Sequence, residues 1–202
     1  VGTSTNGSGA FGSSINILTD GISDDPYAEI SNSFGSYDSR KHTVKFSSGL
    51  INDSFEISGR LSKIDSDGYV DRAFSDLKSY FLQGAYKRGN TFLKALAFGG
   101  HEKTYQAWDG LSKEQIKENR RQNPLTYENE IDNYKQDHYQ MHLNQKIDSK
   151  WSTNIGFNYT YGRGYFEQYR EDDDVSSYGG IVVSDLDTNG NELGTTDLIR
   201  RR

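Results

Sequence analysis

The sequence predicts an all-β chain, an antiparallel up-and-down meander of about seven strands with little helix, forming part of a larger transmembrane β-barrel. From residue 27 onward apolar and polar residues alternate, which is the period of a strand with two unlike faces. Tight and long connections also alternate along the chain, which places the long loops at one end of a meander. One predicted face is apolar and aromatic and the other polar, which suits a barrel with lipid outside and water inside.

Composition excludes several classes of protein. The chain has 202 residues and a net charge of −6, so it has no basic excess with which to hold a nucleic-acid backbone. It has no cysteine, which excludes disulfide scaffolds and cysteine-ligated zinc. The longest apolar runs have about four residues, as at 95–98, whereas a membrane-spanning helix needs about 20. A barrel strand remains compatible, because it needs only one apolar face. An aromatic content of 13% argues against disorder.

The alternation predicts one strand in each of seven segments: 28–34, 43–50, 55–62, 79–86, 91–105, 138–147 and 151–161. In 91–105 both faces are mixed. The aromatic residues assigned to the apolar face are Tyr27, Phe34, Tyr80, Tyr86, Tyr139, Trp151, Tyr159 and Tyr161. The opposite face is predicted to carry Glu29, Lys45, Glu56, Arg60, His138 and His142. The same alternation also fits a soluble antiparallel sheet with one face on a core.

The connections predict where the loops lie. Tight turns are expected at 51–54, 88–90 and 148–150. Long connections are expected at 65–76, at 107–133 and after residue 168, and only 35–40 is short where a long connection is due. A soluble sandwich has no reason to segregate its loops in this way, whereas outer-membrane barrels do. Within the longest loop, 112–122 is expected to form a short polar helix, with Ser112 as N-cap and Gln115 completing a weak capping box.

The glycine-rich opening of the chain carries a more specific motif. Residues 6–19 resemble the end of the plug domain of TonB-dependent outer-membrane receptors. The matching positions are Gly7, Gly9, Ala10, Gly12, Ile15, Asn16, Ile17 and Thr19. Ser13 departs from the pattern, which has a second glycine there. The later stretches 39–43, 59–62, 66–69, 103–108 and 164–169 resemble the first barrel strands of the Bacteroidetes branch of this family.

The resemblance implies a fragment of such a receptor. Residues 1–24 would be the C-terminal end of the plug and the crossing to the barrel. Residues 25–202 would be the N-terminal barrel strands, with long external loops at 107–133 and 169–202, and the whole barrel would have about twenty-two strands. Fourteen starting residues rich in Gly, Ser and Thr also fit a flexible linker, and residues 14–19 read as a short strand.

It also implies a function and a set of partners. The parent protein would be an energy-coupled receptor in the outer membrane of a Gram-negative bacterium, importing a scarce nutrient such as a ferric siderophore. Its partners would be outer-membrane lipid, the remainder of the same receptor chain, and TonB through segments outside these residues. No cofactor and no nucleic-acid partner are expected. The alternatives are a soluble β-sandwich that binds carbohydrate and, more weakly, a β-rich hydrolase.

Candidate chemical sites are few. His138 and His142 lie about 13 Å apart on a strand, so they are expected to be two lumen-facing polar residues rather than metal ligands. The acidic run 171–174 is expected to be a solvated loop, with divalent-cation or lipopolysaccharide-bridging contact as the alternative. Residues 185–190 copy the first half of an EF-hand loop, but Thr196 stands where the bidentate Glu belongs. A hairpin through Asn189-Gly190 is therefore favoured. No Gly-x-Ser-x-Gly elbow or other nucleophile arrangement is present. We therefore predict no catalytic residue, no metal site and no enzyme activity, and the ligand-binding residues stay unassigned.

Overall fold

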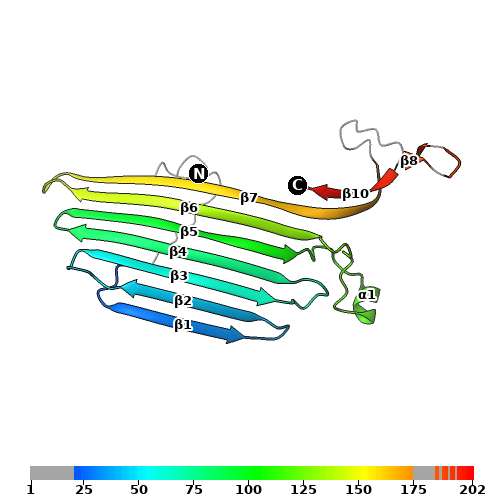
Figure 1. Cartoon of the computed structure of the whole chain (residues 1–202), viewed down its shortest axis with the longest axis horizontal. Coiled ribbons are helices and arrows are strands. Elements are labelled where there is room, and N and C mark those ends of the chain that lie inside the picture. Colours follow the sequence, from blue (N-terminus) through cyan, green and yellow to red (C-terminus); the bar gives the residue numbers. More distant parts are fainter. Residues whose placement is uncertain (1–20, 175–184, 187, 191, 194) are drawn as a thin grey trace.

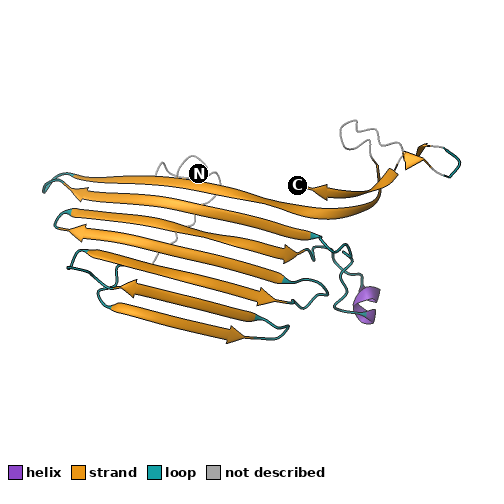
Figure 2. Ribbon diagram, viewed as in Figure 1, coloured by secondary structure: helices purple, strands orange, loops and turns teal. Residues whose placement is uncertain are grey.

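The computed structural model describes residues 21–174, 185–186, 188–190, 192–193 and 195–202. They form an eight-stranded antiparallel sheet in the order β1-β2-β3-β4-β5-β6-β7-β10 (Figure 1). The strands are β1 (Pro26–Phe34), β2 (Arg40–Ser48), β3 (Phe55–Ser66), β4 (Ser75–Arg88), β5 (Thr91–Tyr105), β6 (Ile131–Lys146), β7 (Ser152–Asp174) and β10 (Thr195–Arg201). A separate two-stranded ribbon pairs β8 (Asp185–Leu186) with β9 (Glu192–Leu193). Nearly all of the described structure is strand (Figure 2).

The predicted meander is confirmed. Each of the seven expected strands is present, and each pairs antiparallel with the next along the chain. Within the described residues the sheet stays open, with β1 at one edge and β10 at the other. The residues of the expected plug-end motif, Gly7 to Thr19, lie outside the described residues, and so does the expected strand at 14–19.

The predicted loop at 169–202 needs correction. Strand β7 continues to Asp174, and β10 returns along it with Leu198 opposite Arg170 and Arg201 opposite Glu167. The acidic run 171–174 is therefore strand rather than loop. Sequence periodicity missed this hairpin because most of its side chains are polar and its few apolar residues, Tyr169, Leu198 and Ile199, do not alternate with them.

The loops gather at one end, as the alternation of turns predicted. Figure 1 shows the connections after β1, β3, β5 and β7 at the right-hand end, and those after β2, β4 and β6 at the left. The left-hand connections are tight: Asn52 and Asp53 both have positive φ (51° and 52°), as a type I′ turn requires. Between β4 and β5 only two residues intervene, and Gly89 takes a φ of 55°.

The predicted helix is present but shorter than expected. Helix α1 (Lys113–Glu118) begins after Ser112, whose Oγ accepts from the Gln115 backbone N–H at 3.2 Å. The Gln115 side chain accepts from the Ser112 backbone N–H at 2.8 Å, so the capping box is complete. The helix ends before the predicted residue 122 because Asn119 adopts an extended conformation. None of the described helical structure is long and apolar enough to cross a membrane.

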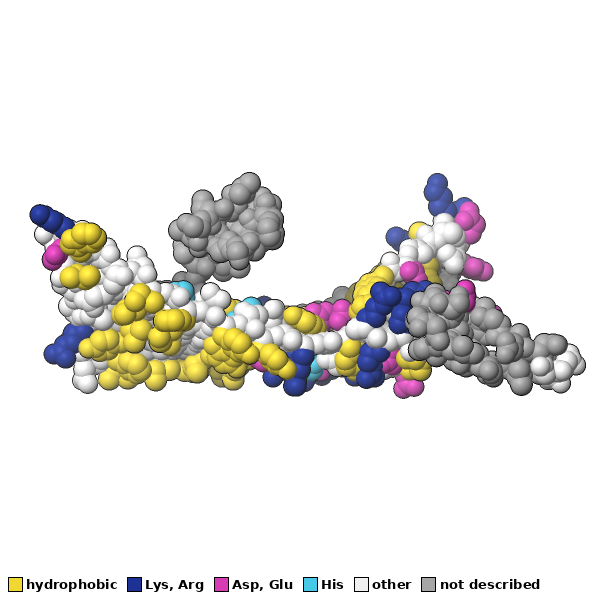
Figure 3. All heavy atoms as spheres, turned by 90° about the horizontal axis from the view of Figure 1, so that it is seen from above, with side chains coloured by type: hydrophobic (Ala, Val, Ile, Leu, Met, Phe, Trp, Pro, Cys, Tyr) yellow, Lys and Arg dark blue, Asp and Glu magenta, His cyan; other side chains and the backbone are white. Residues whose placement is uncertain are grey.

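The sheet is a single layer with almost no core. Among the described residues the buried hydrophobic side chains are Ala85, Leu96, Tyr105 and Ile131. Large hydrophobic side chains are instead exposed, and Figure 3 shows them gathered along one part of the sheet, with charged side chains following toward the loop end. The described sheet therefore leaves an apolar face without any protein layer over it.

Close packing within the apolar face uses aromatic rings placed over glycines. Phe46 lies directly opposite Gly59 in the register, and a Cβ at residue 59 would come within 2.8 Å of its ring. Tyr80 lies opposite Gly99 in the same way, where a Cβ would come 3.0 Å from its ring. These rings lie flat against the neighbouring strand because glycine leaves the space.

Candidate functional site: an apolar band and a polar loop end

One face of the sheet carries a continuous strip of exposed hydrophobic side chains. The strand register aligns them from β1 to β7; for example, Ile30 lies opposite Val44, which lies opposite Leu61. We call this strip the apolar band: Ile30, Val44, Phe46, Phe55, Ile57, Leu61, Leu82, Tyr139, Met141, Ile155, Phe157, Tyr159 and Tyr161. Phe157 and Tyr159 are 62% and 61% exposed, so nothing in the described chain covers them.

The apolar band covers only part of the length of β7. It runs there from Ile155 to Tyr161, six residue steps or about 20 Å along an extended strand. At the strand tilt of about 35–45° found in outer-membrane barrels, this length would rise about 15 Å, which is less than their apolar zone of about 25 Å. Strand β7 has 23 residues, whereas a tilted membrane strand needs about 9–11. The surplus lies at the loop end, where β7 pairs with β10.

The opposite face is polar over most of β1 to β3. The predicted residues Glu29, Lys45 and Arg60 lie opposite one another there, and Glu56, His138 and His142 share that face by strand parity. The assignment of Tyr27 to the apolar face is wrong. Tyr27 pairs with Ser47, whereas its neighbour Ala28 pairs with Phe46, so Tyr27 lies on the polar face. Its aromatic character suggested the band, but side-chain alternation decides the face.

The polar face also contains an aromatic stack that the alternation did not predict. Phe81 and Phe98 have ring centroids 6.2 Å apart, and Phe98 stacks on His138 at 4.7 Å. The His138 Nδ1 lies 2.9 Å from the Thr160 hydroxyl. The mixed faces of 91–105 were the only sequence signal for this stack.

The polar face also buries a carboxylate. Glu56 is 1% exposed, and it accepts hydrogen bonds from the Ser47 hydroxyl at 2.8 Å and the Gln83 amide at 3.2 Å. The Ser23 backbone N–H is a third donor at 3.3 Å. These donors satisfy the buried charge. Nothing in the local sequence marks Glu56, because its donors come from three separate segments.

The predicted metal candidates do not come together. His138 and His142 share a face of β6 but have different neighbours, since His142 Nε2 lies 3.2 Å from Gln140. Over the part of the chain that the structure describes, no group of three or more His, Asp or Glu side chains is placed to hold a metal. The half EF-hand motif forms the favoured hairpin, with Asp185 opposite Leu193 and Leu186 opposite Glu192.

The loop end is held together by hydrogen bonds that range from exposed to fully buried. Arg72, in the β3–β4 connection, donates to the Asn123 carbonyl at 2.8 Å and the Leu125 carbonyl at 2.7 Å. The Tyr105 hydroxyl donates to the Tyr127 carbonyl at 2.7 Å. Gln106 is 2% exposed and donates to the backbone of β7. The long loop 106–130 is thereby fixed against its neighbours.

Glu167 anchors the last part of this loop-end cluster, which we define as Arg72, Tyr105, Gln106, Asn123, Glu167 and their partners. Glu167 lies about 20 Å along β7 beyond the apolar band. Its carboxylate accepts from Asn129 at 2.7 Å and from the Arg201 Nε at 2.8 Å. These two hydrogen bonds hold the pKa of Glu167 below its ordinary value, against the opposing effect of burial. The pKa of Tyr127 is raised by burial and by its hydrogen bond to Glu167.

No family model, no curated protein and no solved structure matches the chain. Function is therefore inferred from the sheet, the apolar band and the loop end.

Proposed function

We propose that this chain is part of the wall of an energy-coupled receptor in the outer membrane of a Gram-negative bacterium. The receptor would import a scarce nutrient such as a ferric siderophore. The observation that carries the proposal is the apolar band, whose exposed members lie on six of the seven strands from β1 to β7, all on one face of a single-layer sheet. Lipid chains would cover this band, and the polar face would line a wet lumen.

The single layer favours a membrane wall over a soluble module. A β-sandwich packs a second sheet about 10 Å away against its apolar face, and the described residues provide one large sheet with four buried hydrophobic side chains. In water, exposed patches of this extent are rare on monomeric proteins. In a bilayer the same patch needs no second layer.

The open edges fit a partial wall. Strand β1 leaves one side of the ladder unpaired, and so does β7 along the apolar band, because β10 pairs only with the loop-end part of β7. Unpaired backbone groups are costly in lipid, so spanning sheets close into barrels. We propose that the remainder of the receptor chain continues the sheet. TonB would act on the plug. Residues 6–19 resemble the end of that plug, and the choice of a siderophore-type nutrient rests on this resemblance.

The lipid contact can be tested directly because the chain has no native cysteine. Phe157→Cys places a thiol in the apolar band, and Asn158→Cys places one on the next residue, on the polar face. Each variant would be labelled with an environment-sensitive dye in phosphatidylcholine vesicles. We expect the label at 157 to be strongly quenched by brominated lipid chains and the label at 158 to be nearly unaffected.

Equal quenching at the two positions, or none at either, would overturn the proposed membrane wall. The transport part is tested separately, by sequencing the reading frame on both sides of this segment. A plug upstream and further alternating strands downstream would support the receptor, and uptake assays under iron limitation would follow. A reading frame without either would contradict it.

A further inference from the structure

A row of basic side chains follows the loop-side border of the apolar band. The register places one on each of six neighbouring strands, all on the same face as the band: His42, Lys63, Lys78, His101, Lys135 and Arg163. We call these six the basic row. Its members lie one same-face step, or about 7 Å, beyond the level of Tyr80 and Tyr161. On β2 to β7 the basic groups therefore lie directly beyond the apolar band.

The other border of the apolar band is built differently. There the corresponding row runs Arg88, Thr91, Gln145 and Thr153, with one basic residue on four strands. Lysine and arginine that merely extend out of a hydrophobic zone would be expected at both borders. The basic row is confined to the loop side, which points to an anionic group on that side alone.

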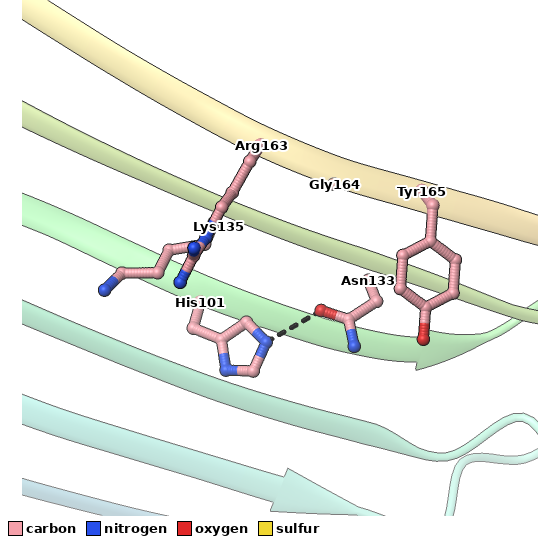
Figure 4. A pocket seen from close by; sticks show the side chains of 6 residues that line it. All are labelled: His101, Asn133, Lys135, Arg163, Gly164 and Tyr165. Atoms are coloured by element: carbon pink, nitrogen blue, oxygen red, sulfur yellow. Dashed lines mark hydrogen bonds between the residues drawn. The ribbon is translucent and has the colours of Figure 1, made fainter.

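The basic row contains a hollow with suitable chemistry. His101, Lys135 and Arg163 line a space of about 520 Å³ together with Asn133 and Tyr165 (Figure 4). The His101 Nε2 lies 2.8 Å from the Asn133 side-chain oxygen, which fixes the ring. Figure 4 shows these side chains on one side of three adjacent strands, with Arg163 reaching from β7 toward β6.

Nearby carboxylates neutralise part of the positive charge of the basic row, but they do not occupy the hollow. Lys63 pairs with Asp65 at 2.9 Å and Lys78 with Asp76 at 3.5 Å, and neither carboxylate lines the hollow. Lys135 lies 3.5 Å from Asp137, whose other oxygen accepts from Tyr80. In the portion of the chain described by the structure, Arg163 makes no ion pair and is exposed. Its planar guanidinium is the group best suited to hold a phosphate with two hydrogen bonds.

We propose that the basic row, through His101, Lys135 and Arg163, binds the phosphate groups of anionic lipid in the leaflet at the loop end. This inference rests on the proposed function, because only a membrane wall brings lipid headgroups to this height. The lipid chains would cover the band below while its phosphate occupies the hollow. The contact would set how deeply the sheet lies in the membrane and which way its loop end is oriented.

The test measures lipid retention by native mass spectrometry of the 202-residue chain in uncharged detergent. The probe is phosphatidic acid, which carries a phosphate monoester, titrated against phosphatidylcholine. We expect a clear preference for phosphatidic acid. Lys135→Gln combined with Arg163→Gln is expected to weaken its retention about thirtyfold, since each basic residue contributes appreciably to anionic-lipid binding. The matched control, Lys45→Gln with Arg60→Gln, removes the same charge from the polar face and is expected to change retention less than about threefold.

Each other outcome overturns the proposal in a recognisable way. Equal losses in the two double variants would show attraction by net charge alone. Competition by inorganic phosphate at the same concentration as the lipid would show a soluble-anion site instead. The brominated-lipid quenching at residue 157 separates this inference from the proposed function. Quenching without phosphatidic-acid preference would refute only the basic row, and loss of quenching would refute both.

Discussion

The apolar band and the loop-end cluster both include residues of β7, yet they leave opposite kinds of side chain uncovered. In the band, Tyr139 and Phe157 are about half or more exposed. At the loop end, the polar Gln106 and Glu167 are at most 3% exposed, and both are hydrogen-bonded. A protein folded for water buries the first set and exposes the second. This difference is what the proposed membrane wall would require, with the band facing lipid and the loop end facing water.

The largest expected effect comes from placing a charge in the apolar band. Phe157→Arg puts a guanidinium near the middle of the proposed lipid zone. We expect it to lower the free energy of unfolding from phosphatidylcholine vesicles by about 2–4 kcal/mol. Asn158→Arg, the neighbouring residue on the polar face, is expected to cost less than about 1 kcal/mol. Denaturant titration followed by tryptophan fluorescence measures both, and equal costs would break the distinction between the faces.

A second, smaller effect tests packing within the band. Gly59→Ala places a Cβ 2.8 Å from the Phe46 ring and 3.1 Å from the Phe81 carbonyl, so the ring must shift. We expect a cost of about 1–3 kcal/mol, typical of overpacking. Gly84→Ala is the matched control on the same face, because its Cβ meets nothing within 4 Å. If the two variants unfold at the same denaturant concentration, the ring-over-glycine contact has no energetic role.

A substitution at the loop end is expected to lower local stability without changing global stability. Arg72→Ala removes the hydrogen bonds to the Asn123 and Leu125 carbonyls. We expect the free energy of local opening of 106–130 to fall by about 1–2 kcal/mol, with global unfolding of the sheet unchanged. Hydrogen exchange measures both quantities. Arg120→Ala, at an exposed position in the same loop, is the control. Faster exchange throughout β4 to β7 would show that the loop-end cluster stabilises the whole sheet.

The sequence predicted the apolar band but not the loop-end cluster. In 151–161 strict alternation predicted the strand, its apolar face and its aromatic residues, because lipid or a core imposes a period of two. The loop-end cluster has no such constraint. Arg72 donates to Asn123 and Leu125, which follow it by 51 and 53 positions in the chain. A single sequence has no periodic pattern that links residues so far apart. Strand β10 was missed for a related reason, since neither of its faces must be apolar.

The smallest expected effect is pH-dependent and confined to β10. Because the folded-state pKa of Glu167 is lowered from its ordinary value of 4.5, the unfolded hairpin binds its proton first as the pH falls. The hydrogen bonds from Asn129 and Arg201 therefore stabilise the β7–β10 hairpin fully above about pH 4.5. That contribution disappears as the pH falls through the lower, folded-state pKa.

We expect amide protection of β10, measured by hydrogen exchange, to fall below pH 4.5 while the apolar band stays protected. Glu167→Gln can still accept from Asn129 and cannot titrate, so it is expected to flatten this acid dependence. Asp197→Asn is the necessary comparison, because the Tyr169 hydroxyl also lowers the pKa of Asp197 in the same hairpin. Acid loss that persists in Glu167→Gln and vanishes in Asp197→Asn would move the pH sensitivity to Asp197. Parallel acid loss in the band would remove the contrast between the two regions, since carboxylates at the loop end would then govern the whole sheet.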